Sequence, residues 1–234
     1  MELSTISAVK RGTPETLAAA SLPENQLFIN GSFVPGASGD SFTVVDPSTG
    51  KGILEIPRAS IEEVDQAVLA AKEAFTEWGR ILPIERAAVL LKIADRLEEH
   101  QAELMGLESL NTGKPSAVAE DDVSSAIDSF RFMAGALRSG TSLSAGEYAK
   151  DHLSMIVREP LGVIGAVTRW NYPLLMGVWK IAPILAAGNT LVLKPSETTP
   201  LSTLKFAQRT ADLLPAGVFN VLTGKGSVIG TRLS

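Results

Sequence analysis

Between residues 161 and 234 the sequence alternates between short apolar segments and longer helical ones, and no other feature limits the fold so strongly. Three segments have the apolar character of buried strands: 163–167, 190–193 and 218–222. Two helical segments separate them: 174–187, which ends at Gly188, and 200–214. Strands that are apolar on both faces are typical of covered sheets, and strands joined through helices pair in parallel. We therefore expect an α/β fold, a parallel sheet with helices on both faces.

The preceding residues predict a hairpin and a group of helices. Asn30-Gly31 lies between apolar residues and predicts a two-residue β-turn, because both turn positions need a positive φ. Ser60 and Glu63 form a capping box, which predicts that a helix begins there. The remaining expected elements are strands at 27–29, 32–34, 43–45 and 153–157, helices at 61–78, 84–110 and 117–137, and a small-residue loop at 141–146. The polar residues 1–25 are interpreted as a flexible leader.

Composition excludes several classes of function. The chain has no cysteine, which excludes disulfides, thiolate metal sites and a cysteine nucleophile within it. His100 and His152 are its two histidines, and their charged surroundings favour surface roles over a metal site or a Ser-His-Asp triad. A net charge of −5 argues against nucleic-acid binding, and no apolar run reaches the roughly 18–20 residues of a membrane span. Since no secretory or transit signal is recognisable, we expect a cytoplasmic location.

The loops that follow the three strands are the candidate sites, because parallel sheets bind ligands at the carboxyl ends of their strands. The first loop is Thr168-Arg169-Trp170-Asn171. The side-chain amide of Asn171 could stabilise negative charge on a carbonyl oxygen. On position alone, capping of the helix that begins at Pro173 is the favoured interpretation.

The second and third loops also leave two interpretations open. Lys194-Pro195-Ser196-Glu197 could bracket a diol between an ammonium and a carboxylate, or could be a surface ion pair. Gly224, Gly226 and Gly230 are compatible with a nucleotide-binding turn at a helix N-terminus, or with an ordinary tight turn.

Taken together, the loop sequences resemble the aldehyde dehydrogenase family. The similarity rests on the order and spacing of residues 170–176, 179–183, 186–190 and 193–201, and it extends from about Leu27 to the last residue. Residues 130–135, 145–148 and 214–218 look most like γ-aminobutyraldehyde dehydrogenases, with betaine-aldehyde dehydrogenases next. The resemblance implies a Rossmann-like parallel sheet, with residues 26–139 and 161–234 as an incomplete NAD-binding domain. Residues 140–160 would be part of the bridging hairpin through which the family forms homo-oligomers.

The resemblance also implies roles for individual residues. Asn171 matches the asparagine whose amide helps form the oxyanion hole over the thiohemiacetal. Lys194 and Glu197 match the pair that holds the adenosine ribose. Further cofactor contacts are implied for Thr168, Arg169, Trp170, Pro195, Ser196 and Gly226. A 2′-phosphate about 4 Å from Glu197 would be repelled by ~1–4 kcal/mol, which favours NAD over NADP.

The family reaction implied is the NAD-dependent oxidation of an aldehyde, here an aminoaldehyde, to its acid. It needs a cysteine nucleophile and a general-base glutamate, which family members carry beyond the point where this sequence ends. We therefore expect this chain alone to be inactive, and a non-catalytic nucleotide-binding or subunit-interaction fragment is the alternative. Two residues depart from the family pattern: Arg169 replaces a usual proline, and Asn111 replaces an aspartate that some relatives use at a cation site.

Overall fold

The computed structural model describes residues 21–139 and 145–234. Its helices are α2 (Ile61–Trp78), α3 (Pro83–Glu99), α4 (Gln101–Thr112), α5 (Ser116–Ser139), α6 (Pro173–Ala186), α7 (Leu201–Thr210), a π-helical turn η1 (Gly226–Gly230) and α8 (Thr231–Leu233). Its strands are β1 (Leu27–Ile29), β2 (Ser32–Val34), β3 (Ser41–Val45), β4 (Gly52–Pro57), β5 (Ala145–Ala149), β6 (His152–Met155), β7 (Val163–Val167), β8 (Thr190–Lys194) and β9 (Phe219–Val221). No helix in these ranges is long and apolar enough to cross a membrane.

The central sheet has five strands in the order β2-β1-β9-β8-β7. Strands β7, β8 and β9 are parallel, with Val167 opposite Lys194 and Leu193 opposite Val221. The predicted parallel sheet is therefore confirmed. The amino-terminal hairpin extends it, because β1 pairs with β9 in the antiparallel direction through Phe28 and Val221. All three parallel strands thus end at the same edge of the sheet.

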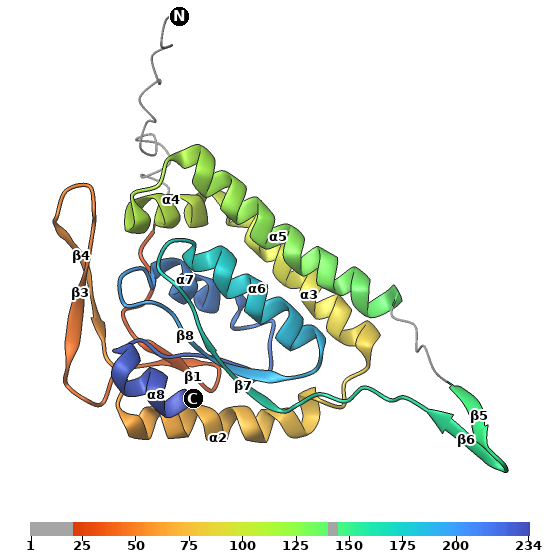
Figure 1. Cartoon of the computed structure of the whole chain (residues 1–234). Coiled ribbons are helices and arrows are strands. Elements are labelled where there is room, and N and C mark those ends of the chain that lie inside the picture. The colour runs from red at the N-terminus through yellow and green to blue at the C-terminus, as the bar shows by residue number, and fades with distance from the viewer. Residues whose placement is uncertain (1–20, 140–144) are drawn as a thin grey trace, which may run out of the picture.

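Helices cover both faces of this sheet, as expected (Figure 1). On one face α2 buries Val64, Ala67 and Ala71 together with Val192 of β8 and Leu222 after β9. The other face carries α6 and α7, with α3 and α5 packed over them (Figure 1). That layer has an aromatic core: Phe206 of α7 stacks on Phe130 at 5.9 Å and meets Phe219 of β9 edge-on at 5.4 Å.

Local sequence signals account for several element boundaries. At the β1–β2 turn, Asn30 and Gly31 have φ values of 51° and 77°, as the hairpin prediction requires. The capping box at the start of α2 is also confirmed: the hydroxyl of Ser60 accepts from the amide of Glu63 at 3.2 Å, and the carboxylate of Glu63 accepts from the amide of Ser60 at 2.8 Å. Gly113 ends α4 with a left-handed φ of 75°.

Other boundaries differ from the sequence predictions. The helix expected at 84–110 is two helices, because the chain leaves helical geometry at His100, and both helices pack on α5. The helix expected to reach 214 ends at Thr210. Strand β4 was not predicted, although it pairs with β3 along its whole length. Ala145 and Gly146 begin β5 and pair with β6, where a loop was expected.

Two predicted segments lie outside the sheet and its helices: the amino-terminal leader and the bridging hairpin. The leader predicted at 1–25 lies largely outside the described residues, but the Nζ of Lys205 donates to the Ser21 hydroxyl at 3.1 Å and to the carbonyl of Leu22 at 2.9 Å. The β5–β6 hairpin projects away from the sheet, and nearly all of its residues are exposed (Figure 1). Its bridging role stays a prediction.

Candidate functional site

The ends of the three parallel strands bring their loops together. The amide of Thr168 after β7 donates to the carbonyl of Lys194 at 3.1 Å, and the amide of Leu222 after β9 donates to the carbonyl of Leu193 at 2.9 Å. The hydroxyl of Thr199 then donates to the carbonyl of Trp170 at 2.8 Å. These bonds hold the loop after β8 between its two neighbours.

Lys194 is the buried cation at this edge, with 4% of its surface exposed. Its side chain runs toward the η1 turn: a Cβ added at Gly226 or Gly230 would lie 3.8 or 3.7 Å from its methylene groups. Its Nζ donates to the carbonyl of Pro195 at 2.8 Å, and an ammonium can donate two more hydrogen bonds. Burial lowers the pKa of Lys194, and the charge of Glu197 offsets part of this effect.

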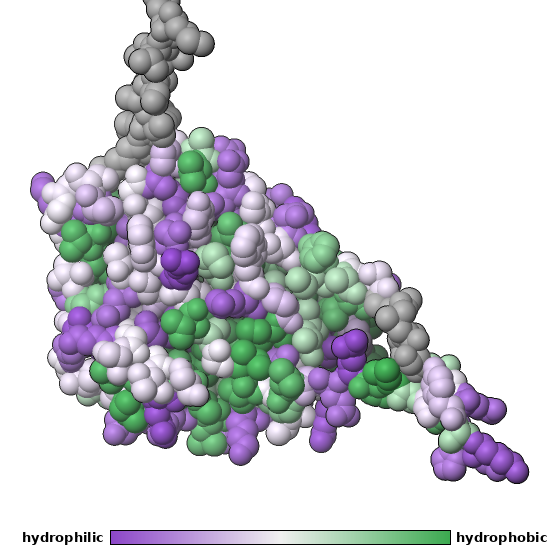
Figure 2. All heavy atoms as spheres, in the orientation of Figure 1, coloured by the Kyte–Doolittle hydropathy of each residue, from purple (hydrophilic) through white to green (hydrophobic). Residues whose placement is uncertain are grey.

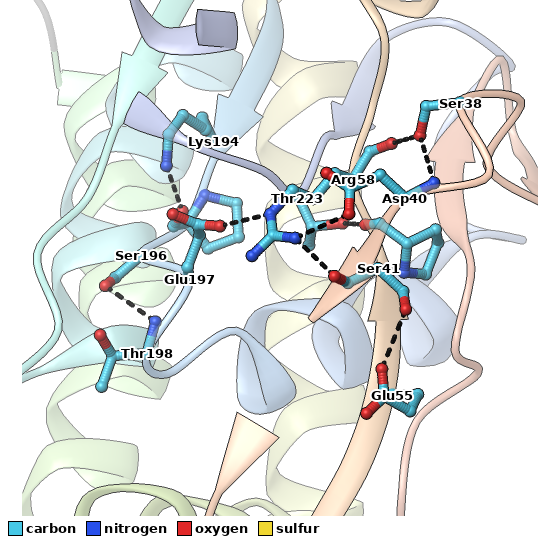
Figure 3. Close-up of polar contacts among 12 residues, drawn as sticks. Ser38, Asp40, Ser41, Glu55, Arg58, Lys194, Ser196, Glu197, Thr198 and Thr223 are labelled. Carbon is cyan, nitrogen blue, oxygen red and sulfur yellow. Dashed lines mark hydrogen bonds and ion pairs between the residues drawn. The ribbon is translucent and has the colours of Figure 1, made fainter. Parts of the chain in front are cut away.

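Glu197 lies two residues beyond Pro195 on the same loop and is partly buried (Figure 3). Its Oε1 accepts a hydrogen bond from the Nε of Arg58 at 3.0 Å. Its Oε2 accepts none from the residues that the structure describes. The loop therefore presents a buried ammonium with donors to spare and a carboxylate oxygen that can still accept.

Arg58 also belongs to this site, although no sequence pattern predicts it. It follows β4 in the chain and is 139 residues away from Glu197. Neither a motif nor a periodic pattern marks it, because its place depends on how β4 crosses to the carboxyl edge of the sheet. A bond from the Thr223 hydroxyl to the carbonyl of Pro57, at 2.6 Å, ties this crossing to the end of β9 (Figure 3).

The loop after β7 holds the remaining predicted residues. Arg169 and Trp170 are exposed, and Asn171 is partly buried. The capping interpretation of Asn171 is wrong, because Tyr172 is the N-cap residue of α6 and no side chain of the loop caps the helix. Among described residues the amide of Asn171 makes no hydrogen bond, so its predicted role as a donor stays open to a ligand.

The amino end of α6 is held by a carboxylate from α4. Glu108 is fully buried, and its Oε1 accepts from the amide of Leu174 at 3.1 Å and from the hydroxyl of Ser202. Its Oε2 accepts from Lys114 at 2.8 Å. The Nζ of Lys114 also lies 5.0 Å from the ring centre of Tyr172. Glu108 thus fixes the start of the helix that directly follows Asn171.

Asn111 forms a second link from α4 to the site. Its side-chain nitrogen donates to the carbonyl of Thr198 at 3.1 Å, and its oxygen accepts from the amide of Leu201 at 3.3 Å. It therefore braces the end of the loop that carries Glu197.

Within the described ranges no group of three or more acidic or histidine side chains could hold a metal ion.

The site residues fit a nucleotide cofactor. Lys194 can donate to hydroxyl or phosphate oxygens, and Glu197 can accept from a hydroxyl. The hydroxyl oxygen of Thr168 is buried at the same edge without a hydrogen-bond partner among the described residues. Gly226 is exposed beside Lys194, so a planar base could approach the backbone there. The structure thus brings together Thr168, Lys194, Pro195, Ser196, Glu197 and Gly226, with Arg169, Trp170 and Asn171 on the adjoining loop.

The parallel sheet, its two helical layers and the loops at its carboxyl edge define a Rossmann-like α/β domain, a class that binds nucleotides at this edge. The sequence matches the model of the Aldehyde dehydrogenase family over residues 33–234. The chain belongs to this family, and its fold is that of the family's cofactor-binding domain.

Individual relatives cover nearly the whole chain. Cytosolic 10-formyltetrahydrofolate dehydrogenase of Xenopus tropicalis is 43% identical over 217 residues, which are 90% of this chain and 24% of that protein. The crystal structure of the aldehyde dehydrogenase KauB from Pseudomonas aeruginosa has a TM-score of 0.89 at 36% identity and covers 93% of this chain and 45% of its own. The crystal structure of betaine aldehyde dehydrogenase from Staphylococcus aureus, in complex with NAD+, has a TM-score of 0.88 at 33% identity. The match covers 93% of this chain and 44% of that one. The chain therefore spans about a quarter of the curated relative and under half of the solved ones.

Proposed function

We propose that this chain is the cofactor-binding part of an NAD-dependent aldehyde dehydrogenase. The observation that carries the proposal is the convergence of Lys194, Glu197 and Gly226 at the carboxyl edge of the parallel sheet. The betaine aldehyde dehydrogenase described above, whose structure holds NAD+, shares this fold at 33% identity and supports the choice of cofactor.

Each site residue has a defined task in this proposal. Lys194 donates to the hydroxyls of the adenosine ribose, and Glu197 accepts from one of them through Oε2. Gly226 lets the adenine lie against the backbone, and Thr168, Arg169, Trp170, Pro195 and Ser196 line the rest of the cofactor. Asn171 directs its amide at the oxygen of the aldehyde, where it stabilises developing negative charge. NAD, when bound, would supply the acceptor for the hydride of the aldehyde.

The finer parts of the proposal concern substrate, location and assembly. An aminoaldehyde is the proposed substrate class, on the similarity of residues 130–135, 145–148 and 214–218 to aminoaldehyde dehydrogenases. A cytoplasmic location is supported by the similarity to the Xenopus relative, which is a cytosolic dehydrogenase. The exposed β5–β6 hairpin is proposed to contact other subunits of a homo-oligomer.

Nucleotide binding by the purified chain tests this function. Isothermal titration with NAD should show one site, and Lys194→Met should weaken binding about tenfold or more, because a buried charge-assisted donor is lost. Lys92→Met is the matched control, since Lys92 is an exposed lysine of α3. Steady-state assays with NAD and γ-aminobutyraldehyde should show no turnover, because the chain contains no cysteine.

Two results would contradict the proposal. One is the absence of any NAD binding by a folded chain. The other is an equal loss of affinity in Lys194→Met and Lys92→Met, which would place the nucleotide away from this edge. Turnover well above a blank without protein would contradict the predicted inactivity, since the family reaction needs a thiolate nucleophile.

A further inference from the structure

The turn between β1 and β2 carries the only Asn-Gly pair of the sequence, Asn30-Gly31. Asn30 is exposed, and among the described residues its side-chain amide makes no hydrogen bond. The backbone amide of Gly31 makes none to a described residue either. Because glycine has no side chain, its nitrogen can approach the side chain of the preceding residue without steric hindrance. A nitrogen nucleophile and an electrophilic amide carbon are therefore neighbours at an exposed turn.

The surrounding fold holds this turn closed. Asn30 and Gly31 have φ values of 51° and 77°, the left-handed values of a two-residue hairpin turn. The backbone amide of Asn30 donates to Oδ1 of the buried Asn220 at 2.9 Å. A Cβ added at Gly31 would lie 3.1 Å from Ala216, so the turn packs closely on its neighbour. Any reaction that reshapes the main chain between the two residues requires these contacts to open first.

We propose that Asn30 is a site of spontaneous modification, at which the asparagine is converted to isoaspartate and aspartate. The backbone nitrogen of Gly31 loses its proton and forms a bond to Cγ of Asn30. The bond from Cγ to Nδ2 breaks, and Nδ2 takes up a proton and leaves as ammonia. Water then adds to either carbonyl carbon of the five-membered imide. Opening at Cγ gives aspartate, and opening at the main-chain carbon gives isoaspartate. The sequence of steps needs no oxidant or reductant.

The two products affect the hairpin differently. Aspartate keeps the length of the main chain and tolerates a positive φ. Isoaspartate lengthens the main chain by one carbon in a turn whose flanking pairs are fixed, with Ile29 opposite Ser32 and Phe28 opposite Phe33. The ring centres of Phe28 and Phe33 are 5.0 Å apart. Isoaspartate should therefore weaken the attachment of β2 and this aromatic contact.

The position of β2 in the sheet makes the reaction possible in the folded chain. This strand is the last one on its side of the five-stranded sheet, and it pairs with β1 alone. Elements at the margin of a structure open locally at a lower free energy than the core does. The planar imide includes main-chain atoms of both turn residues, so it forms in these open states. The fold thus slows the conversion without preventing it, and the rate follows the opening of the hairpin.

Incubation of the purified chain at mildly alkaline pH, followed by tryptic digestion and mass spectrometry, tests the proposal. Residues 12–51 form one tryptic peptide, in which Asn25 is an internal control, since it is also exposed but precedes Gln26. Fragmentation should place the replacement of NH₂ by OH at Asn30, at a rate about tenfold or more above that of Asn25. Enzymatic methylation of isoaspartyl groups should label the same residue. A chain unfolded in urea should convert faster, because its turn is open.

Two phenylalanine variants test the dependence on hairpin opening. Phe33→Ala removes the aromatic contact that holds β2, and should speed the conversion about fivefold or more. Phe42→Ala is the matched control, since Phe42 is a partly buried phenylalanine of β3, in a different sheet. It should leave the rate within about twofold of the wild type.

A variant of Asn30 itself separates the modification from other ageing of the chain. Asn30→Gly keeps the turn, because glycine accepts a positive φ, and it has no side-chain amide to lose. It should gain no mass at residue 30 and should keep its midpoint of thermal unfolding during incubation, whereas the midpoint of the wild type falls.

The proposal is overturned if the folded wild type converts Asn30 no faster than Asn25, whatever the unfolded chain does. Equal rates in Phe33→Ala and Phe42→Ala would overturn the dependence on hairpin opening. Circular dichroism before incubation shows that each variant is folded. None of these outcomes depends on the proposed nucleotide site, because the reaction involves only the turn and water.

Discussion

Glu103 shows how strongly one carboxylate can be held at the junction of two helices. It lies on α4, and the guanidinium of Arg209 on α7 donates to both of its oxygens at 2.8 and 2.7 Å. The ammonium of Lys205, itself almost fully buried, lies 3.5 Å away. Burial works against the charged form of Glu103. The hydrogen bonds from Arg209 and Ser21 and the charge of Lys205 nevertheless lower its pKa from 4.5 to about 2.

This network predicts a defined loss of stability in acid. Because the folded pKa of Glu103 is below the unfolded one, its contribution is complete above pH 4.5 and is lost as the pH falls toward 2. The contribution is about 2–3 kcal/mol. In urea titrations at pH 7 and pH 3, Glu103→Gln should lower the free energy of unfolding at pH 7 and flatten its decline with pH. Glu99→Gln, which alters an exposed ion pair, should change it by less than about 1 kcal/mol. An unchanged pH dependence in Glu103→Gln would contradict this account.

Single residues also mark the limit of what the sequence could predict about the site. Lys194 and Glu197 could be placed on one loop because they directly follow a recognisable strand. Gly226 could be predicted as a site residue because it belongs to a closely spaced group of glycines after the third strand. Arg58 could not, since only the folded chain brings it to Glu197. The same is true of Glu108, which lies in an amphipathic helix yet binds the amide of Leu174 on another.

At the scale of elements, the packing of α2 on the sheet depends on a glycine. Gly217 lies just before β9 with a φ of 81°. A Cβ at this position would lie 2.5 Å from the carbonyl oxygen of Ala70 in the middle of α2. The close approach of helix and turn thus requires both the positive φ and the absence of a side chain.

Gly217→Ala should therefore destabilise the chain by about 3 kcal/mol or more, the sum of a strained backbone and an overpacked contact. Gly50→Ala is the control: its φ of 69° carries the same strain, but nothing lies within 4 Å of the added Cβ. It should cost about 1–2 kcal/mol. Urea denaturation of both variants measures the difference, and equal losses would show that the contact with Ala70 is relieved by a small shift of α2.

The elements that the sequence predicted best are those with local determinants. The Asn30-Gly31 hairpin and the Ser60 capping box depend on residues next to one another, and both are confirmed. The break between α3 and α4 at His100 has no such signal, because the apolar pattern continues through it. Strand β4 also lacks a local signal in the sequence. Its extended conformation is defined by its pairing with β3.

At the scale of the whole molecule, one sheet edge collects loops from distant parts of the chain. The parallel order of β7, β8 and β9 could be predicted from their apolar character and the intervening helices. The antiparallel pairing of the predicted hairpin with β9 could not be predicted, and neither could the crossing of β4, which brings Arg58 to the site. Apolar residues are also exposed near α6 and β7, the outer strand, where Figure 2 shows them grouped. Trp179 of α6 is 55% exposed and Val167 of β7 is 48% exposed.

The central claim is that the loops after β7, β8 and β9 hold a single nucleotide. A crystal structure of this chain grown with NAD tests it most directly. The claim predicts density for the adenosine ribose within hydrogen-bond distance of Lys194 Nζ and Glu197 Oε2, with the adenine beside Gly226. Density elsewhere on the molecule, or none at a concentration that saturates the chain in solution, would contradict it.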